Sequence, residues 1–326
     1  MLRCYAVIDN KVDLVDIDKV DDLENIVWID VFSPTKQEES LIESLLGINI
    51  PTRDEMHEIE FSSRLYHRNT TLYATTILVT KSETISPESH AITFILNKNY
   101  LVSVRYVDVP PFNNFLKWQP SLMPQRVQGN TILAGMLEFM IDQMADMLES
   151  IGRKIDAITK DIFHSNQPSN KSEEITHDFK NILSFIGLIG DLLSKSRESF
   201  LTISRMLGYL LSSDYFNKIH GDQKRIEMML RDMASLSDHA SFLSNKVNFL
   251  LDATLGMINI EQNRIIKIFS VAAVVLLPPT MVASIYGMNF KSMPELDWSF
   301  GYPFAIAVMI LSGFLPYKFF KKKGWL

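Results

Sequence analysis

The hydrophobic pattern changes once along this 326-residue chain. Up to about residue 115, short runs rich in β-branched and aromatic residues alternate with turn residues, which predicts strands over 5–8, 26–31, 72–80, 91–96 and 100–105. One helix is predicted over 35–46, where apolar residues recur at helical spacing between Ser33-Pro34-Thr35 and Gly47. We therefore expect a mixed α/β domain over residues 1–115.

Beyond residue 130 the strand pattern gives way to long helical patterns. Two helices are predicted over 131–163 and 173–211, with breaks at 165–172 and 212–221, where Asn, Pro, Ser and Gly gather. The segment 113–129 carries Pro120, Pro124 and Gly129, and it is predicted to be a connection. Together these segments form an expected helical region over 116–221.

A third helix is predicted from Asp222 onward, and it has coiled-coil spacing. Apolar residues recur every seven positions at Leu236, Leu243, Leu250 and Met257. No proline interrupts residues 222–277, so this stalk helix, over 222–264, is expected to continue into the next apolar segment. A helix of about 60 residues is about 90 Å long, three times the thickness of a bilayer core.

Two apolar segments near the C-terminus are long enough to cross a membrane. Residues 265–285 contain one charge, Lys267, and residues 299–317 contain none, which disfavours two buried core helices. We predict spans over 265–285 and 299–320, a loop over 286–298 and a basic tail over 321–326. Four lysines follow the uncharged residues 299–317, at Lys318, Lys321, Lys322 and Lys323. The positive-inside rule then places both ends of the chain in the cytoplasm.

One face of the first span is suited to line a water-filled path. Two helices enclose no interior, so transport requires a ring of identical chains. Steps of three and four residues connect small and polar residues with two apolar exceptions, namely Asp252, Gly256, Asn259, Asn263, Ile266, Ser270, Ala273, Leu277, Thr280 and Ser284. The alternative is that these small residues mediate tight helix packing. Pro278 and Pro279 free backbone carbonyls that protein or channel water must satisfy.

Composition and motif searches exclude several classes of function. The sequence has 32 basic and 38 acidic residues, a net charge of -6, which argues against nucleic acid as a partner. Cys4 is the one cysteine, as expected for a reducing compartment, and the first ten residues do not resemble a secretory signal. Because phosphate-binding loops, dinucleotide fingerprints and His-Glu-x-x-His sites are absent from the sequence, we predict no enzymatic activity and no organic cofactor.

The loop after the first span carries a family signature. Tyr286-Gly287-Met288-Asn289-Phe290 is followed by Met293-Pro294-Glu295-Leu296. With the second span and the lysine-rich end, residues 245–326 closely resemble the CorA family of magnesium and cobalt transporters. The resemblance implies a funnel-shaped homopentamer in a bacterial inner membrane. It also implies an α/β cytoplasmic domain, a stalk helix that becomes the pore, and an outer ring formed by the signature loop.

The signature has a chemical rationale, because magnesium loses its water shell reluctantly. The selectivity loop would consist of Gly287, Met288 and Asn289. In it, the Gly287 carbonyl and the Asn289 side-chain oxygen would contact the hydrated ion through its waters. Asn263, Thr280 and Ser284 are candidate water-contacting rings, and Ile266 and Leu277 are candidate constrictions. By resemblance, Asp252 matches the acidic ring at the cytoplasmic mouth, with Gly256 and Asn259 beside it and the four lysines as a basic ring. An ordinary solvated stalk residue is the alternative for Asp252.

The membrane potential suffices to drive such a transporter, and a divalent ion gains about 4.6 kcal/mol per 100 mV. Mg²⁺ is expected both as the transported ion, with cobalt and possibly nickel, and as a regulatory ion that closes the channel from the cytoplasm. Its acidic ligands cannot be chosen from sequence; the candidates are Glu55, Glu58, Glu60, Glu173, Glu174, Asp232 and Asp238. Two alternatives remain: a zinc transporter of the same superfamily, and a membrane-anchored receptor or scaffold.

Overall fold

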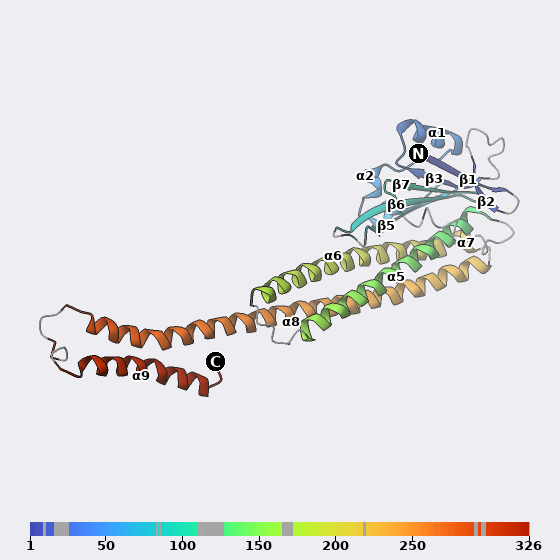
Figure 1. The fold of residues 1–326 in the computed structure, drawn as a ribbon. Helices are drawn as coiled ribbons and strands as arrows, with labels where there is room; N and C mark the ends of the chain where they lie inside the picture. Colours follow the sequence, from blue (N-terminus) through green and yellow to red (C-terminus); the bar gives the residue numbers. More distant parts are fainter. Residues whose placement is uncertain are drawn as a thin grey trace. The chain divides into compact units, whose positions relative to one another are not determined.

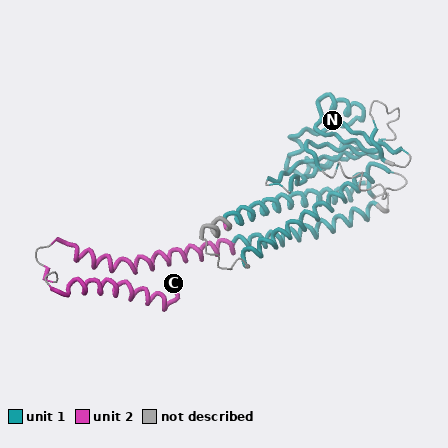
Figure 2. The backbone as a smooth tube through the Cα atoms, viewed as in Figure 1, with its two compact units in different colours: residues 1–170, 180–251 teal, residues 171–179, 252–326 magenta. Residues whose placement is uncertain are grey.

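The computed structural model describes residues 1–8, 11–15, 26–82, 84, 86–109, 112, 127–164, 172–217, 220–289, 293–294 and 298–325. The chain divides into two compact units (Figure 2). Unit 1 comprises Met1–Asn170 and Lys180–Leu251, and unit 2 comprises Lys171–Phe179 and Asp252–Leu326. The predicted break at 165–172 and connection at 113–129 lie mostly outside the described residues.

Seven strands of the described chain form one mixed sheet in unit 1, in the order β2-β1-β3-β7-β6-β5-β4. The strands are β1 (Leu2–Ile8), β2 (Lys11–Val15), β3 (Ile26–Phe32), β4 (Leu65–Arg68), β5 (Thr71–Thr80), β6 (Glu88–Leu96) and β7 (Leu101–Arg105). The central pair β3 and β7 is parallel, and the other pairs are antiparallel. The five strands predicted from sequence are confirmed.

The two strands that the sequence patterns did not reveal are the edges of the sheet, β2 and β4. They are short, with the sequences Lys-Val-Asp-Leu-Val and Leu-Tyr-His-Arg. Charged and polar residues are typical of edge strands, because they discourage pairing with other chains. The same residues weaken the alternating pattern by which a strand is recognised.

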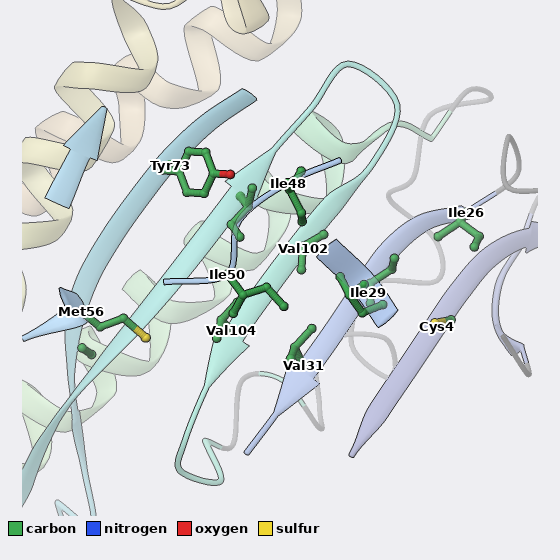
Figure 3. Packing of buried hydrophobic residues seen from close by; sticks show 13 residues of the cluster. Cys4, Ile26, Ile29, Val31, Ile48, Ile50, Met56, Tyr73, Val102 and Val104 are labelled. Atoms are coloured by element: carbon green, nitrogen blue, oxygen red, sulfur yellow. The ribbon is translucent and has the colours of Figure 1, made fainter. Parts of the chain in front are cut away.

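A hydrophobic core fills one side of the sheet (Figure 3), and the short helices α1 (Lys36–Leu46) and α2 (Arg53–Met56) each contribute a buried residue to it. A third short helix, α3 (Phe61–Arg64), follows and has no buried residue. Ile42 and Met56 pack there with inward residues of the central strands, including Val102 and Val104. Thr35 and Glu38 form a capping box that starts α1, and Gly47 ends it in the left-handed conformation. The predicted first helix is thereby confirmed with its boundaries.

Three long helices complete unit 1, namely α5 (Gly129–His164), α6 (Ser172–Leu211) from Lys180 onward, and the part of α8 (His220–Tyr286) up to Leu251 (Figure 1). The short α7 (Asp214–Asn217) lies between α6 and α8 in the chain. The seven-residue repeat packs on helices of the same chain. Leu243 lies 3.9 Å from the Cβ position of Gly152 in α5, and Val247 lies 3.9 Å from that of Gly190 in α6.

Two described helices are long and apolar enough to cross a membrane, α8 and α9 (Gly301–Lys322). α8 runs without interruption through the predicted stalk and first span and includes both Pro278 and Pro279. This is the predicted fold class, an N-terminal α/β domain followed by a long helix and two C-terminal apolar helices.

Candidate functional site

Unit 2 pairs the membrane part of α8 with α9. Val271 of α8 is 3% exposed and Ala305 of α9 is 6% exposed, whereas most residues around them are exposed. Pro279 Cγ lies 3.1 Å and the Val275 carbonyl oxygen 3.2 Å from the Cβ position of Gly313 in α9. The side of α8 that packs on α9 is therefore the one that carries Val271, Val275 and Pro279.

The predicted pore stripe occupies the opposite side of α8. All ten of its residues, from Asp252 to Ser284, are exposed. Successive residues of a helix are rotated by about 100°, which puts the middle of the stripe roughly half a turn away from Val271 and Val275. Serine, threonine and asparagine side chains are poorly solvated by hydrocarbon, so this face requires contact with protein or water.

Thr280 and the two prolines determine which polar groups this helix offers. The Thr280 hydroxyl donates to the Leu276 carbonyl at 2.7 Å, which uses its proton and leaves its lone pairs as acceptors for water. Pro279 has no amide to donate to the Val275 carbonyl four residues earlier. That carbonyl oxygen points at α9, 3.2 Å from the Cβ position of Gly313.

The signature loop begins where α8 ends. The Gly287 amide donates to the Ala283 carbonyl at 3.0 Å, and the Met288 amide donates to the Ile285 carbonyl at 3.2 Å. A Cβ at Gly287 would lie 3.2 Å from that same Ala283 oxygen, which favours glycine there. Met288 and Asn289 are exposed, and Asn289 is the third residue after the helix. The rest of the loop is described only at 293–294 and 298.

The basic residues gather at the other end of α9. Lys318, Lys321, Lys322 and Lys323 are all exposed. The Lys321 ammonium lies 5.9 Å from the ring centre of Tyr317. Lys267 of α8 lies 5.9 Å from the ring centre of Trp325, so basic groups of both helices lie at this end of unit 2.

Among the described residues, no group of three or more His, Cys, Asp and Glu side chains is arranged to hold a metal ion. Two of the candidate regulatory acids have particular surroundings. Glu55 caps α2 by accepting from the Thr52 amide at 2.7 Å, and this bond lowers the pKa of its carboxyl. The side chains of Glu173 and Glu174 lie outside the described part of the chain.

Asp232 belongs to an acidic patch that the sequence patterns did not single out. Burial raises the pKa of Asp142, and the charges of Glu138, Asp146 and Asp232 raise it further. Glu138, Asp142 and Asp146 follow one another at four-residue spacing along α5, and Asp232 faces them from α8. The four-residue spacing of acids on one helix face was the available signal.

Comparison with known proteins identifies the family. The family model described as "CorA-like Mg2+ transporter protein" matches residues 24–322. The chain belongs to the CorA family. It is 35% identical over 328 residues to the magnesium transport protein CorA of Yersinia pseudotuberculosis, with 100% of both chains covered. It is 35% identical over 329 residues to the Escherichia coli K12 protein of the same name, again with both chains fully covered.

A solved CorA structure supports the fold. The complete structure of the CorA magnesium transporter from Methanocaldococcus jannaschii superposes with a TM-score of 0.78 at 17% identity, covering 100% of this chain and 99% of that one. The resemblance inferred from the signature is thus confirmed along the whole length of the chain. CorA proteins are transporters and not enzymes, and the chain is a membrane protein with two transmembrane helices.

Proposed function

We propose that the chain conducts magnesium, and with it cobalt and nickel, through a homopentameric channel lined by one α8 helix from each copy. The observation that carries this proposal is the exposed stripe from Asp252 to Ser284, on the side of α8 away from α9. A ring of copies would enclose the stripe around a wet axis and leave α9 on the outside. The protein would lie in the bacterial inner membrane, with both termini in the cytoplasm.

Selection of the ion would take place at the signature loop. Magnesium keeps its waters, so the entrance should present acceptors to those waters and not to the bare ion. The Gly287 carbonyl and the Asn289 side-chain oxygen supply neutral acceptors just beyond the end of α8. A ring of carboxylates there would bind a divalent ion too tightly, because conduction needs sites that the ion can leave. This reasoning favours magnesium over zinc, as does the similarity to the magnesium transport proteins of Yersinia pseudotuberculosis and Escherichia coli.

The stripe would then pass the ion through alternating surroundings. Side-chain oxygens that can bind water are offered by Ser284, Thr280, Ser270 and Asn263. Ala273 is small enough to leave room for the hydrated ion. Leu277 is 65% exposed and Ile266 is 61% exposed, and rings of these side chains would close the path by excluding water.

The cytoplasmic mouth of the channel would be formed by Asn259, Gly256 and Asp252. The four lysines after α9 residue 317 would form a basic ring outside this mouth.

The membrane potential would supply the driving force, about 4.6 kcal/mol for a divalent ion at 100 mV. This driving force corresponds to a ratio of about 10³ between internal and external magnesium concentrations at equilibrium. The channel must therefore close once the cell holds enough magnesium. We propose that cytoplasmic Mg²⁺ closes it by binding acidic residues of unit 1. The charges of Glu138, Asp146 and Asp232 repel the Asp142 carboxylate, and a divalent cation would relieve that repulsion, although Arg225 already pairs with Glu138 at 2.7 Å.

Asn289→Ala tests the entrance. The purified protein is reconstituted in liposomes with an internal magnesium indicator, and uptake is compared with that of Ser299→Ala, a control at the same end of the membrane helices. We expect Asn289→Ala to abolish magnesium uptake while the mass of the assembly is unchanged. Unaltered uptake by Asn289→Ala would reject the role of this residue.

The same liposomes separate the other functions. Uptake of zinc without magnesium by the unmodified protein would support the zinc transporter. A further outcome is that the protein transports none of magnesium, cobalt, nickel and zinc, even at a membrane potential of 100 mV and low internal magnesium. This outcome would support a membrane-anchored receptor.

A further inference from the structure

An apolar groove of about 480 Å³ runs along one flank of the α8–α9 pair. Its lining residues are Val275, Leu276, Pro279, Met309, Ile310, Gly313, Phe314 and Tyr317. Tyr317 is the one lining residue with a polar side-chain group. At Gly313 the groove is closed by direct contact of the two helices, because the Cβ position of Gly313 lies 3.1 Å from Pro279 Cγ.

The groove ends at a positive charge. Ile310, Gly313, Phe314 and Tyr317 lie on one face of α9, and Lys321 follows Tyr317 on that face by one more turn. The Lys321 ammonium lies 5.9 Å from the centre of the Tyr317 ring, so the cation lies directly over the last lining residue. Lys322 is rotated by about 100° from Lys321 and therefore points away from this face.

We propose that this groove binds one anionic phospholipid, with an acyl chain along the apolar lining and the headgroup phosphate at Lys321. The distance from Ile310 to Lys321 is about 16 Å along the helix axis. This is roughly half of the ~30 Å hydrocarbon core, which is the depth that the acyl chains of one leaflet occupy. A cationic side chain at the end of an apolar groove between membrane helices is the arrangement that recognises anionic headgroups.

This inference rests on the two membrane helices and does not depend on the proposed conduction pathway. The groove lies on the flank that carries Leu276 and Pro279, and this flank borders the stripe because Leu276 is one turn before Thr280, but no stripe residue lines the groove. A channel could conduct without the lipid, and the lipid could bind to a protein that conducts nothing. Lipid binding can therefore be measured with no metal present.

The test counts lipids on the intact assembly. The full-length protein is purified in a neutral detergent and mixed with phosphatidylglycerol or phosphatidylcholine of identical acyl chains, and native mass spectrometry gives the number retained per chain. We expect phosphatidylglycerol to be preferred in the unmodified protein. Lys321→Gln should weaken its retention about fivefold, the effect of one basic residue at the membrane surface, and Lys322→Gln should leave retention unchanged.

A second pair of variants tests the acyl-chain part of the site. Ile310→Trp fills the groove and should reduce retention of both lipids, whereas Leu311→Trp, at an exposed neighbouring position outside the lining, should not. Equal losses in Lys321→Gln and Lys322→Gln would reduce the effect to diffuse charge and overturn the proposal. Retention unaffected by Ile310→Trp would also overturn it, as would a changed number of chains in that variant, which would assign the groove to contact with a second copy.

Discussion

Gly313 of α9 lies against Pro279 of α8 with no room for a side chain between them. A Cβ at Gly313 would be 3.1 Å from Pro279 Cγ and 3.2 Å from the Val275 carbonyl oxygen. The oxygen is the one that Pro279 deprives of its amide donor. Small residues that let backbones approach closely are a principal means of helix association in membranes, where lipid competes for apolar contact.

Gly313→Val is therefore expected to force α8 and α9 apart. Overpacking of this kind costs about 1–3 kcal/mol. Unfolding of the detergent-solubilised protein by increasing dodecyl sulfate, followed by circular dichroism, measures the loss. Ala307→Val makes the same kind of enlargement at an exposed position of α9 and serves as the control. Equal effects of the two substitutions would show that the contact at Pro279 is unimportant.

The second prediction concerns the stability that a buried ion pair gives to the sheet. Arg105 Nη2 lies 2.8 Å from Asp30 Oδ2, and Arg105 Nε lies 3.1 Å from Asp30 Oδ1, with both side chains 1% exposed. The guanidinium also lies over the rings of Phe32 and Phe112. Arg105→Met leaves the Asp30 carboxylate buried without its partner, and we expect a loss of about 3–5 kcal/mol in the free energy of unfolding.

Chemical denaturation monitored by the fluorescence of the buried Trp28 measures that loss. Lys81→Met removes one partner of the exposed Lys81–Glu88 pair and should cost far less than Arg105→Met, because solvent screens an exposed pair. The double variant Asp30→Leu with Arg105→Met should recover part of the stability, since it leaves no unpaired charge. A double variant less stable than Arg105→Met would contradict this explanation.

Asp30 and Arg105 also mark the limit of prediction from sequence. Patterns within one element can be recognised in the sequence, so the central strands, the first helix and the long helices were predicted close to their observed bounds. The ion pair joins residues 75 positions apart, and only the parallel register of β3 with β7 brings them together. No local pattern contains that register.

In the candidate site, too, some features could be predicted from local sequence patterns and others depend on tertiary contacts. The spacing of three and four residues identified the stripe on α8, but the side on which α9 packs depends on contacts such as Gly313 with Pro279. The signature loop has no periodicity, and its recognition depended on resemblance to a family. The acidic patch needed the pairing of α5 with α8, which brings Asp232 to Asp142.

The start of α5 provides a sharper stability test. A Cβ on Gly129 would lie 2.4 Å from the Tyr100 carbonyl carbon and 2.8 Å from the Leu101 amide nitrogen, both of them backbone atoms. Gly129→Ala should therefore displace α5 from β7 and lower the thermal unfolding midpoint by several degrees or prevent folding. Gly187→Ala, in the interior of α6 with nothing within 4 Å of the new Cβ, should instead stabilise the protein by up to about 1 kcal/mol. A harmless Gly129→Ala would refute the close approach.

The acidic patch predicts a dependence of stability on pH. Burial and then the neighbouring carboxylates raise the pKa of Asp142 above its ordinary value of 3.8. A carboxyl whose pKa is higher in the folded state favours folding most below its unfolded pKa, and this contribution is lost as the pH rises through the folded pKa. Asp142→Asn should stabilise the protein at pH 7 by less than about 1 kcal/mol, and the gain should shrink at pH 4.

Thermal unfolding at the two pH values measures this difference, with Glu149→Gln as a control at an exposed acid of the same helix. Magnesium added at constant ionic strength should raise the unfolding midpoint of the unmodified protein more than that of Asp142→Asn. An equal rise in both proteins would remove the patch from the list of regulatory sites.

The stripe itself can be tested with cysteines, because Cys4 is the one natural cysteine and is 2% exposed. Ser270→Cys and Thr280→Cys should react with a water-soluble methanethiosulfonate at least about tenfold faster than Leu276→Cys, since thiolates form in water and not in hydrocarbon. Leu276 is a demanding control because it is 65% exposed and lies one helical turn before Thr280, at the edge of the stripe but outside it. If Leu276→Cys reacts as fast as the stripe variants while magnesium uptake persists, the small and polar residues of α8 serve helix packing and the water path lies elsewhere.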